Sequence, residues 1–166
     1  MATVATVPER LNEFTPGQAL RSAWLAWLIM LCIPALMFLA VMWATMATSE
    51  PPKGRFAEAW FIGCMIYLGI AVPGAFFWRS HYFKNYWAGK VVKPRDYFKG
   101  MFIIWLSMEI GGILALIGCL ISNSLVPNIL PALVAFMLFT PFWPTGRAMT
   151  NPMGNDPDSE IYEHPR

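Results

Sequence analysis

The chain has 166 residues, of which 57% are hydrophobic and 13% are charged. An average soluble domain has roughly 45–50% hydrophobic and about 25% charged residues, so this composition argues against a soluble protein and indicates a membrane protein. Walker A, G-x-S-x-G and H-E-x-x-H motifs do not occur in the sequence, so the corresponding enzyme classes have no support and we expect a protein that is not an enzyme.

The first two apolar segments are uncharged and long enough to cross a membrane. Residues 22–47 and 59–78 contain no Asp, Glu, Lys or Arg, and about 18 such residues suffice to predict a transmembrane helix. The first segment is also longer than the apolar core of a signal peptide, which is about 7–15 residues, so we expect it to be retained. These segments predict spans near 23–47 and 59–78.

The next apolar stretch, residues 101–146, contains a single charged residue, Glu109. As one helix it would be about 69 Å long, more than twice the roughly 30 Å of the hydrocarbon core. The polar stretch Ser122–Asn128 contains Pro127, which disfavours a helical conformation in the residue before it and cannot donate a backbone hydrogen bond. We therefore expect the chain to turn there.

The turn divides this stretch into spans near 101–121 and 127–143. The fold class that follows is an all-α integral membrane protein with four transmembrane helices, arranged as two helical hairpins over residues 23–143. Pro131 and Pro141 both fall within the fourth segment, so a re-entrant segment remains an alternative to a full span there.

The basic residues predict how the chain is threaded. With four spans, the N-terminal segment 1–22, the central loop 79–100 and the tail 144–166 share one side of the membrane, and Lys53 and Arg55 lie on the other. The first side holds Arg10, Arg21, Arg79, Lys84, Lys90, Lys93, Arg95, Lys99, Arg147 and Arg166. Because basic residues concentrate in cytoplasmic segments, we expect a multi-pass protein of the cytoplasmic (inner) membrane with both termini inside.

The central loop, "RSHYFKNYWAGKVVKPRDYFKG", interleaves basic and aromatic residues. Next to two spans, aromatic rings settle at the level of the lipid headgroups and cations attract the anionic leaflet, so the lipid bilayer and its anionic lipids are the expected partners. A docking surface for another protein remains an alternative, and nucleic acid is not expected. The residues expected to make these contacts are Arg79, Lys84, Tyr86, Trp87, Lys90, Lys93, Arg95 and Lys99.

The third span carries the one acid that is predicted to lie within the membrane. Glu109 lies about 12 Å along the helix from Met101, too deep for its side chain to reach the headgroups easily. An ionised carboxylate facing lipid at that depth is costly, so we expect the acid to be neutral and to face protein or a hydrated cavity. It is either a proton or cation site, or a hydrogen-bonding group that fixes helix packing, with Ser107 as its closest polar companion in the sequence.

A helical wheel separates two faces of this span. Around the direction of Glu109 lie Trp105, Gly112, Ile113 and Leu116. The opposite face carries Gly111, Ala115 and Gly118, whose small side chains allow a neighbouring helix to approach closely, so these three are expected packing residues.

The residues that bind cofactors are scarce. The only histidines are His81 and His164, outside the spans, and Cys32, Cys64 and Cys119 each occur singly within a span. These positions provide neither a pair of axial haem ligands nor a C-x-x-C site, so we expect no cofactor and no metal. The tail 144–166 is polar and is expected to be flexible.

We expect a structural or accessory component of a membrane assembly, built from this chain together with other membrane subunits or further copies of itself. The alternative is a small oligomeric proton-coupled transporter or channel that uses Glu109. Four short spans with one intramembrane glutamate resemble the plan of the small multidrug-resistance transporters. Those proteins are shorter and carry the acid in their first span, so the resemblance lies in the plan and includes no shared motif.

Overall fold

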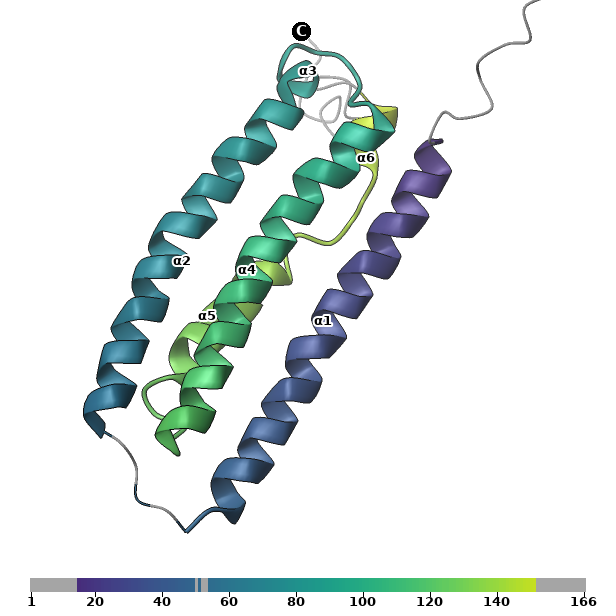
Figure 1. Ribbon diagram of the computed structural model, residues 1–166. Helices are drawn as coiled ribbons and strands as arrows, with labels where there is room; N and C mark the ends of the chain where they lie inside the picture. Colours follow the sequence, from purple (N-terminus) through teal and green to yellow (C-terminus); the bar gives the residue numbers. More distant parts are fainter. Residues whose placement is uncertain (1–14, 50, 52–53, 152–166) are drawn as a thin grey trace, which may run out of the picture.

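The computed structural model describes residues 15–49, 51 and 54–151, and this part of the chain is all-helical (Figure 1). Its helices are α1 (Pro16–Ala47), α2 (Gly54–Tyr82), α3 (Lys84–Trp87), α4 (Pro94–Ser122), α5 (Ile129–Phe139) and α6 (Arg147–Thr150). The prediction of an all-α fold is confirmed for these residues.

Three of the helices are long and apolar enough to cross a membrane. α1 has 32 residues, and α2 and α4 have 29 each, so they are about 43–48 Å long and exceed the roughly 30 Å hydrocarbon core. They contain the first three predicted spans and are typical of a membrane protein. Large apolar side chains, such as Leu36 on α1 and Ile70 on α2, are exposed along most of the length of these helices.

α1 and α4 begin before the apolar windows, because residues that favour the start of a helix precede these windows. Thr15 and Gln18 form a capping box, in which the Thr15 hydroxyl accepts from the Gln18 N–H and the Gln18 side chain accepts from the Thr15 N–H. α4 begins with Pro94, whose missing N–H costs no hydrogen bond there, because the first N–H groups of a helix have no intrahelical acceptor. Most of the predicted loop 79–100 is helical, because α2 continues to Tyr82, α3 follows and α4 begins at Pro94, so that only residues 88–93 lie between α3 and α4.

α4 is the central helix of the bundle. It packs against α2, α1 and α5, and it lies between α1 and α2 in Figure 1. Of the two expected helical hairpins, α1 and α2 do not pack extensively against each other because α4 lies between them, whereas the consecutive helices α4 and α5 do pack together. The reason is visible on α4, which is the most buried of the three candidate spans and presents small residues on more than one face.

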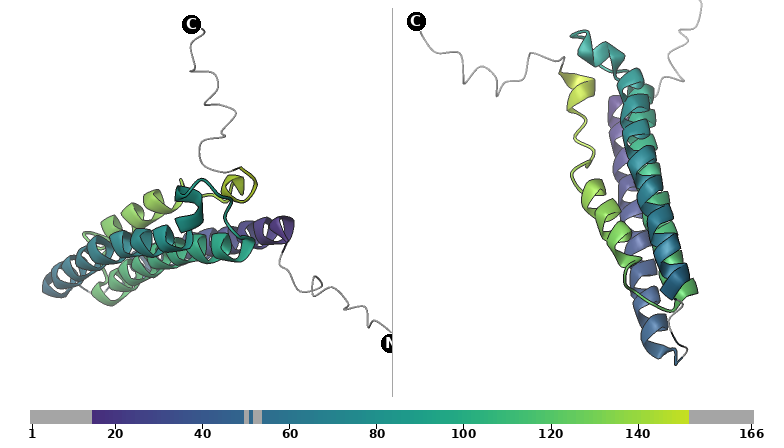
Figure 2. Two further views of the ribbon diagram at one scale, coloured as in Figure 1. Left: turned by 90° about the horizontal axis from the view of Figure 1, so that it is seen from above. Right: turned by 90° about the vertical axis from the view of Figure 1, so that its left-hand side faces the viewer.

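The fourth predicted span is not a full-length helix. α5 has 11 residues, which correspond to about 16 Å, roughly half of the hydrocarbon core. Pro141 and Pro144 then keep the following residues out of a helix. The non-helical segment 140–146 continues alongside α4 to α6 (Figure 2).

Side chains of α4 satisfy backbone groups of this segment. The Trp105 indole N–H donates to the Phe142 carbonyl oxygen at 2.8 Å, and the Tyr97 hydroxyl accepts from the Gly146 N–H at 3.1 Å. Gly146 has a φ of 72°, a left-handed conformation that glycine adopts without strain. Non-helical backbone at membrane depth is tolerated when protein groups bind it in this way.

We call the end of the bundle that holds the start of α1, α3, the start of α4 and α6 the basic end (Figure 1). Except for Arg55, every Lys and Arg that the structure describes belongs to this end. Arg10, Lys53 and Arg166 lie outside the described residues.

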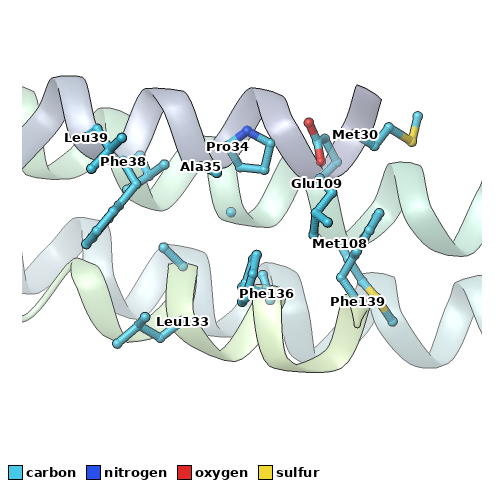
Figure 3. Close-up of a pocket in the computed structure, with 15 residues that line it drawn as sticks. Met30, Pro34, Ala35, Phe38, Leu39, Met108, Glu109, Leu133, Phe136 and Phe139 are labelled. Atoms are coloured by element: carbon cyan, nitrogen blue, oxygen red, sulfur yellow. The ribbon is translucent and has the colours of Figure 1, made fainter. Parts of the chain in front are cut away.

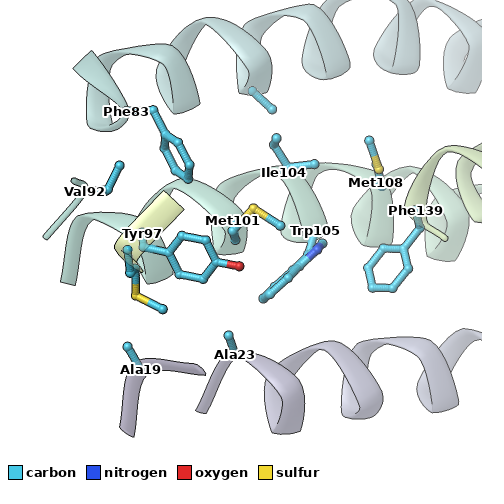
Figure 4. Close-up of a cluster of buried hydrophobic side chains, with 12 residues drawn as sticks. Ala19, Ala23, Phe83, Val92, Tyr97, Met101, Ile104, Trp105, Met108 and Phe139 are labelled. Carbon is cyan, nitrogen blue, oxygen red and sulfur yellow. The ribbon is translucent and has the colours of Figure 1, made fainter. Parts of the chain in front are cut away.

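The basic end is well packed. A cluster of buried side chains joins α1, α4 and the chain around α6, with Tyr97, Met101 and Trp105 at its centre (Figure 4). The Val92 N–H donates to the Ala148 carbonyl oxygen at 2.8 Å, and the Met149 side chain is buried. The first part of the predicted flexible tail is therefore packed, and the remainder, residues 152–166, lies outside the described residues.

Candidate functional site

A groove with a volume of about 380 Å³ lies between α1, α4 and α5. α1 and α5 both pack on α4, and residues from all three helices line the groove. Its walls are almost entirely apolar. They are formed by Met30, Leu31, Pro34, Ala35, Phe38, Leu39, Met108, Glu109, Gly112, Leu116, Ala132, Leu133, Ala135, Phe136 and Phe139.

Glu109 is the one ionisable group that lines this groove. Its side chain is 8% exposed, and its carboxyl group points from α4 toward α1, near Met30 and Pro34 (Figure 3). Within the described part of the chain, the structure contains no hydrogen bond or ion pair to this carboxyl group. A buried polar group without a partner is energetically costly, so Glu109 has an unused capacity for hydrogen bonding.

The polar group lies at one end of the groove. Figure 3 shows Glu109 and Met30 toward one end of the groove and Leu39 toward the other. Leu116, which follows Glu109 along α4, also lines the groove. Glu109 and Leu116 are two turns apart, which corresponds to about 10 Å along α4. The groove is thus elongated and apolar, with a carboxyl group near one end.

Pro34 lies on α1 near Glu109. Proline has no backbone N–H, so the carbonyl of Met30, one turn earlier, lacks its usual intrahelical donor. Met30 and Pro34 both line the groove on the helix opposite Glu109.

The predicted packing residues lie on the other side of α4, against α2. A Cβ atom added to Gly111 would overlap the Leu68 side chain, and one added to Gly118 would overlap the Trp60 indole. Ala115 is fully buried. The structure therefore places Gly111 and Gly118 in close contact with α2, and Ala115 is buried on the same helix between them.

Polar side chains of α2 donate hydrogen bonds to backbone carbonyls of α4. The Trp60 indole N–H donates to the Leu114 carbonyl oxygen at 2.8 Å, and the Tyr67 hydroxyl donates to the Ser107 carbonyl oxygen at 3.4 Å. The Ser107 hydroxyl donates to the Ile103 carbonyl oxygen of its own helix at 2.8 Å. Ser107 and Glu109 therefore serve different sides of α4, and the structure does not bring them together.

Trp60 and Trp105 matter for the fold but were not among the residues predicted from the sequence. Each donates an indole N–H to a carbonyl far along the chain. The sequence signal was weak, because tryptophan in a span also occurs at lipid interfaces.

At the basic end, the predicted contact residues fall into two groups. Those with exposed side chains are Lys84, Trp87, Lys90, Lys93, Arg95 and Lys99. Trp87 is 60% exposed, beside Val91 at 47%. Tyr86 is half-buried, and so is Arg79, whose guanidinium lies 4.6 Å from the centre of the Phe83 ring.

Comparison of the chain with protein-family models, curated proteins and solved structures finds no match. The function is therefore inferred from the geometry of the two regions described above.

Proposed function

We propose that this chain is a non-enzymatic multi-pass membrane protein that serves as a structural or accessory component of a membrane assembly. It binds no cofactor or metal. The basic end attaches it to the membrane surface and to other subunits or further copies of itself. We propose further that the chain returns across the membrane through α5 and segment 140–146, so that both termini are cytoplasmic in a cytoplasmic (inner) membrane.

The single observation that carries this proposal is the ordered presentation of exposed apolar and basic groups at the basic end. Trp87 and Val91 are exposed among Lys84, Lys90 and Lys93. Aromatic and aliphatic groups insert at the headgroup level, and each cation near an anionic surface contributes about 1 kcal/mol.

The backbone around these side chains is held in place. The Gly89 and Lys90 N–H groups donate to carbonyls of α3, and the Val92 N–H donates to Ala148 in the C-terminal region. The Phe83 ring is buried against Gly100. These side chains are therefore held in a fixed arrangement. They lose less conformational freedom than a flexible loop would when they bind an anionic membrane surface or a partner.

Two measurements test the proposal on the full-length protein. Purification from its native membrane in a mild detergent, followed by mass spectrometry, is expected to recover stable foreign subunits or a defined homo-oligomer. A monomer that copurifies with nothing would contradict an accessory role.

Lipid binding is tested with the triple substitution Lys84→Gln, Lys90→Gln and Lys93→Gln. Native mass spectrometry is expected to show retention of phosphatidylglycerol over phosphatidylcholine by the unmodified protein, and a loss of most of that preference in the triple variant. Arg55→Gln, at the opposite end, is the matched control and is expected to keep the preference. Equal retention of both lipids by the unmodified protein would refute the electrostatic contact.

A second candidate function is proton-coupled transport or conduction by an oligomer, and the position of Glu109 favours it. The carboxyl group faces an open groove and has no partner among the described residues. Ionisable groups at membrane depth commonly belong to proton or ion pathways.

Glu109→Gln separates the two functions, because an amide keeps the hydrogen-bonding ability but cannot release a proton. A transporter is expected to lose pH-driven flux in proteoliposomes with this substitution while remaining folded. Glu58→Gln, an exposed acid near the start of α2, is the control. Proteoliposomes without flux, or flux that persists in Glu109→Gln, would exclude this role for Glu109.

A further inference from the structure

Independently of the proposed function, we propose that the groove between α1, α4 and α5 is a binding site for a single elongated, neutral lipophile whose one oxygen-bearing group, a carbonyl or a hydroxyl, hydrogen-bonds Glu109. The apolar chain of this molecule lies along the groove toward Leu39 and Leu116.

The size and walls of the groove support a ligand of this class. Its volume of about 380 Å³ is within the range of small-molecule sites, which are roughly 300–1,000 Å³, mostly apolar and supplied with a few polar groups. A cavity with apolar walls does not hold ordered water stably, because a buried water needs several polar partners. Inside a membrane, an apolar molecule is the natural occupant.

The shape of the groove also requires an elongated molecule with its polar group at one end. The Glu109 carboxyl group lies near one end, while Phe38, Leu133 and Leu116 line the rest. Gly112, which lies between Glu109 and Leu116 on α4, leaves space in the groove. Within 4 Å, and apart from its own helix backbone, a Cβ atom added to Gly112 would meet only the Ala135 Cβ, at 3.7 Å.

The chemistry of the polar end favours a neutral ligand over a cation. The groove lining contains no Lys, Arg or His, so an ionised carboxylate would have no counter-charge near the middle of α4. A neutral carboxylic acid provides one O–H donor and one carbonyl acceptor. A ligand carbonyl accepts from that donor, and a ligand hydroxyl can also donate to the carbonyl oxygen of the acid.

A cationic head group would be less favourable. It would have to be transferred to the middle of the hydrocarbon and would bring additional donors to a site with few acceptors. A neutral oxygen-bearing group avoids both costs.

Access is lateral, from the hydrocarbon core. Leu39 on α1 and Leu133 on α5 line the groove and are exposed, at 60% and 44% respectively. A lipophile dissolved in the bilayer can therefore enter between these two helices without crossing water.

The test uses the full-length protein in phosphatidylcholine nanodiscs and a long-chain methyl ketone that carries a diazirine at the far end of its chain. After illumination, peptide mapping is expected to find the label near Leu39 and Leu133. Equal labelling of the outer face of α2 around Ile70 would show ordinary lipid contact and would overturn the proposal.

Two matched glycine substitutions locate the site. Gly112→Leu fills the groove and is expected to lower the labelling by about tenfold, because the added side chain occupies the ligand volume. Gly69→Leu places the same side chain on α2 in open space and is expected to have no effect. If Gly112→Leu does not fold, Ala35→Trp fills the groove from α1. Labelling that survives the blocking substitution would refute the site.

Competition with unlabelled molecules of the same chain length identifies the polar group. The ketone and the alcohol are expected to compete at least about fivefold better than the alkane, and this difference should vanish in Glu109→Leu and persist in Glu109→Gln. Stronger competition by the alkylammonium would show a cation site, and equal competition by the alkane would show that Glu109 takes no part. Either result would overturn the proposal.

Discussion

Replacement of Gly118 by alanine tests the contact between α2 and α4. Gly118 lies beneath the Trp60 indole, and an added Cβ atom would overlap that ring. The ring cannot move aside freely, because its N–H donates to the Leu114 carbonyl oxygen at 2.8 Å. Gly118 is four residues after Leu114, so its missing side chain is what leaves this carbonyl accessible to the indole.

The magnitude follows from three contributions. Overpacking of a well-packed contact costs about 1–3 kcal/mol, and loss of an interhelical hydrogen bond in a membrane protein costs about 0.6–1.7 kcal/mol. The higher helix propensity of alanine returns up to about 1 kcal/mol. We therefore expect Gly118→Ala to lower the free energy of unfolding by roughly 1–4 kcal/mol.

The assay is denaturant-induced unfolding of the purified protein in mixed micelles, followed by tryptophan fluorescence or circular dichroism. Gly63→Ala is the control, because a Cβ atom at Gly63 meets nothing within 4 Å, and it is expected to be neutral or slightly stabilising. Trp60→Phe should cost about 0.6–1.7 kcal/mol through loss of the indole donor. Equal stability of Gly118→Ala and Gly63→Ala would refute this account of the helix contact.

The remaining predictions concern the C-terminal region, the groove and the topology. Gly146→Ala should lower the free energy of unfolding by about 1–2 kcal/mol, because alanine is strained at the φ of 72°; Gly17→Ala, in open space, should not, and similar values for both would contradict the argument. Glu109→Leu should leave stability unchanged or raise it by about 1 kcal/mol, because the acid has no partner to lose; a loss of that size in the same unfolding assay would reveal a hydrogen bond that the structure does not contain. Cysteines introduced at Lys90 and Arg55, in a background without native cysteines, should react with a membrane-impermeant maleimide from opposite sides; reaction of both from one side would exclude the proposed topology.

Local composition determined the long helices. Three uncharged or nearly uncharged windows predicted α1, α2 and α4, because every backbone polar group in a membrane must be satisfied within the segment and a helix does this by itself. The ends of these helices were less predictable, since Thr15 and Pro94 extend the helices into regions where the apolar signal has already ended. Hydropathy measures transfer into lipid, not the positions of caps.

The fourth segment shows where composition stops being sufficient. Its apolar residues predicted a span, but α5 ends at Phe139 and the chain continues without helical hydrogen bonds. That conformation depends on Trp105 and Tyr97 of α4, which bind backbone groups at Phe142 and Gly146. A one-dimensional pattern contains no information about partners that lie 37 and 49 residues away in the chain.

The candidate site divides in the same way. The helical periodicity of the sequence determined that Glu109, Gly112 and Leu116 share one face of a helix and that Gly111 and Gly118 lie on another. Only the tertiary structure decided what each face meets: the small residues meet α2, and the acid meets an open groove between α1 and α5. The physical reason is that periodicity follows from the geometry of one helix, whereas the neighbour of each face depends on how all the helices pack together.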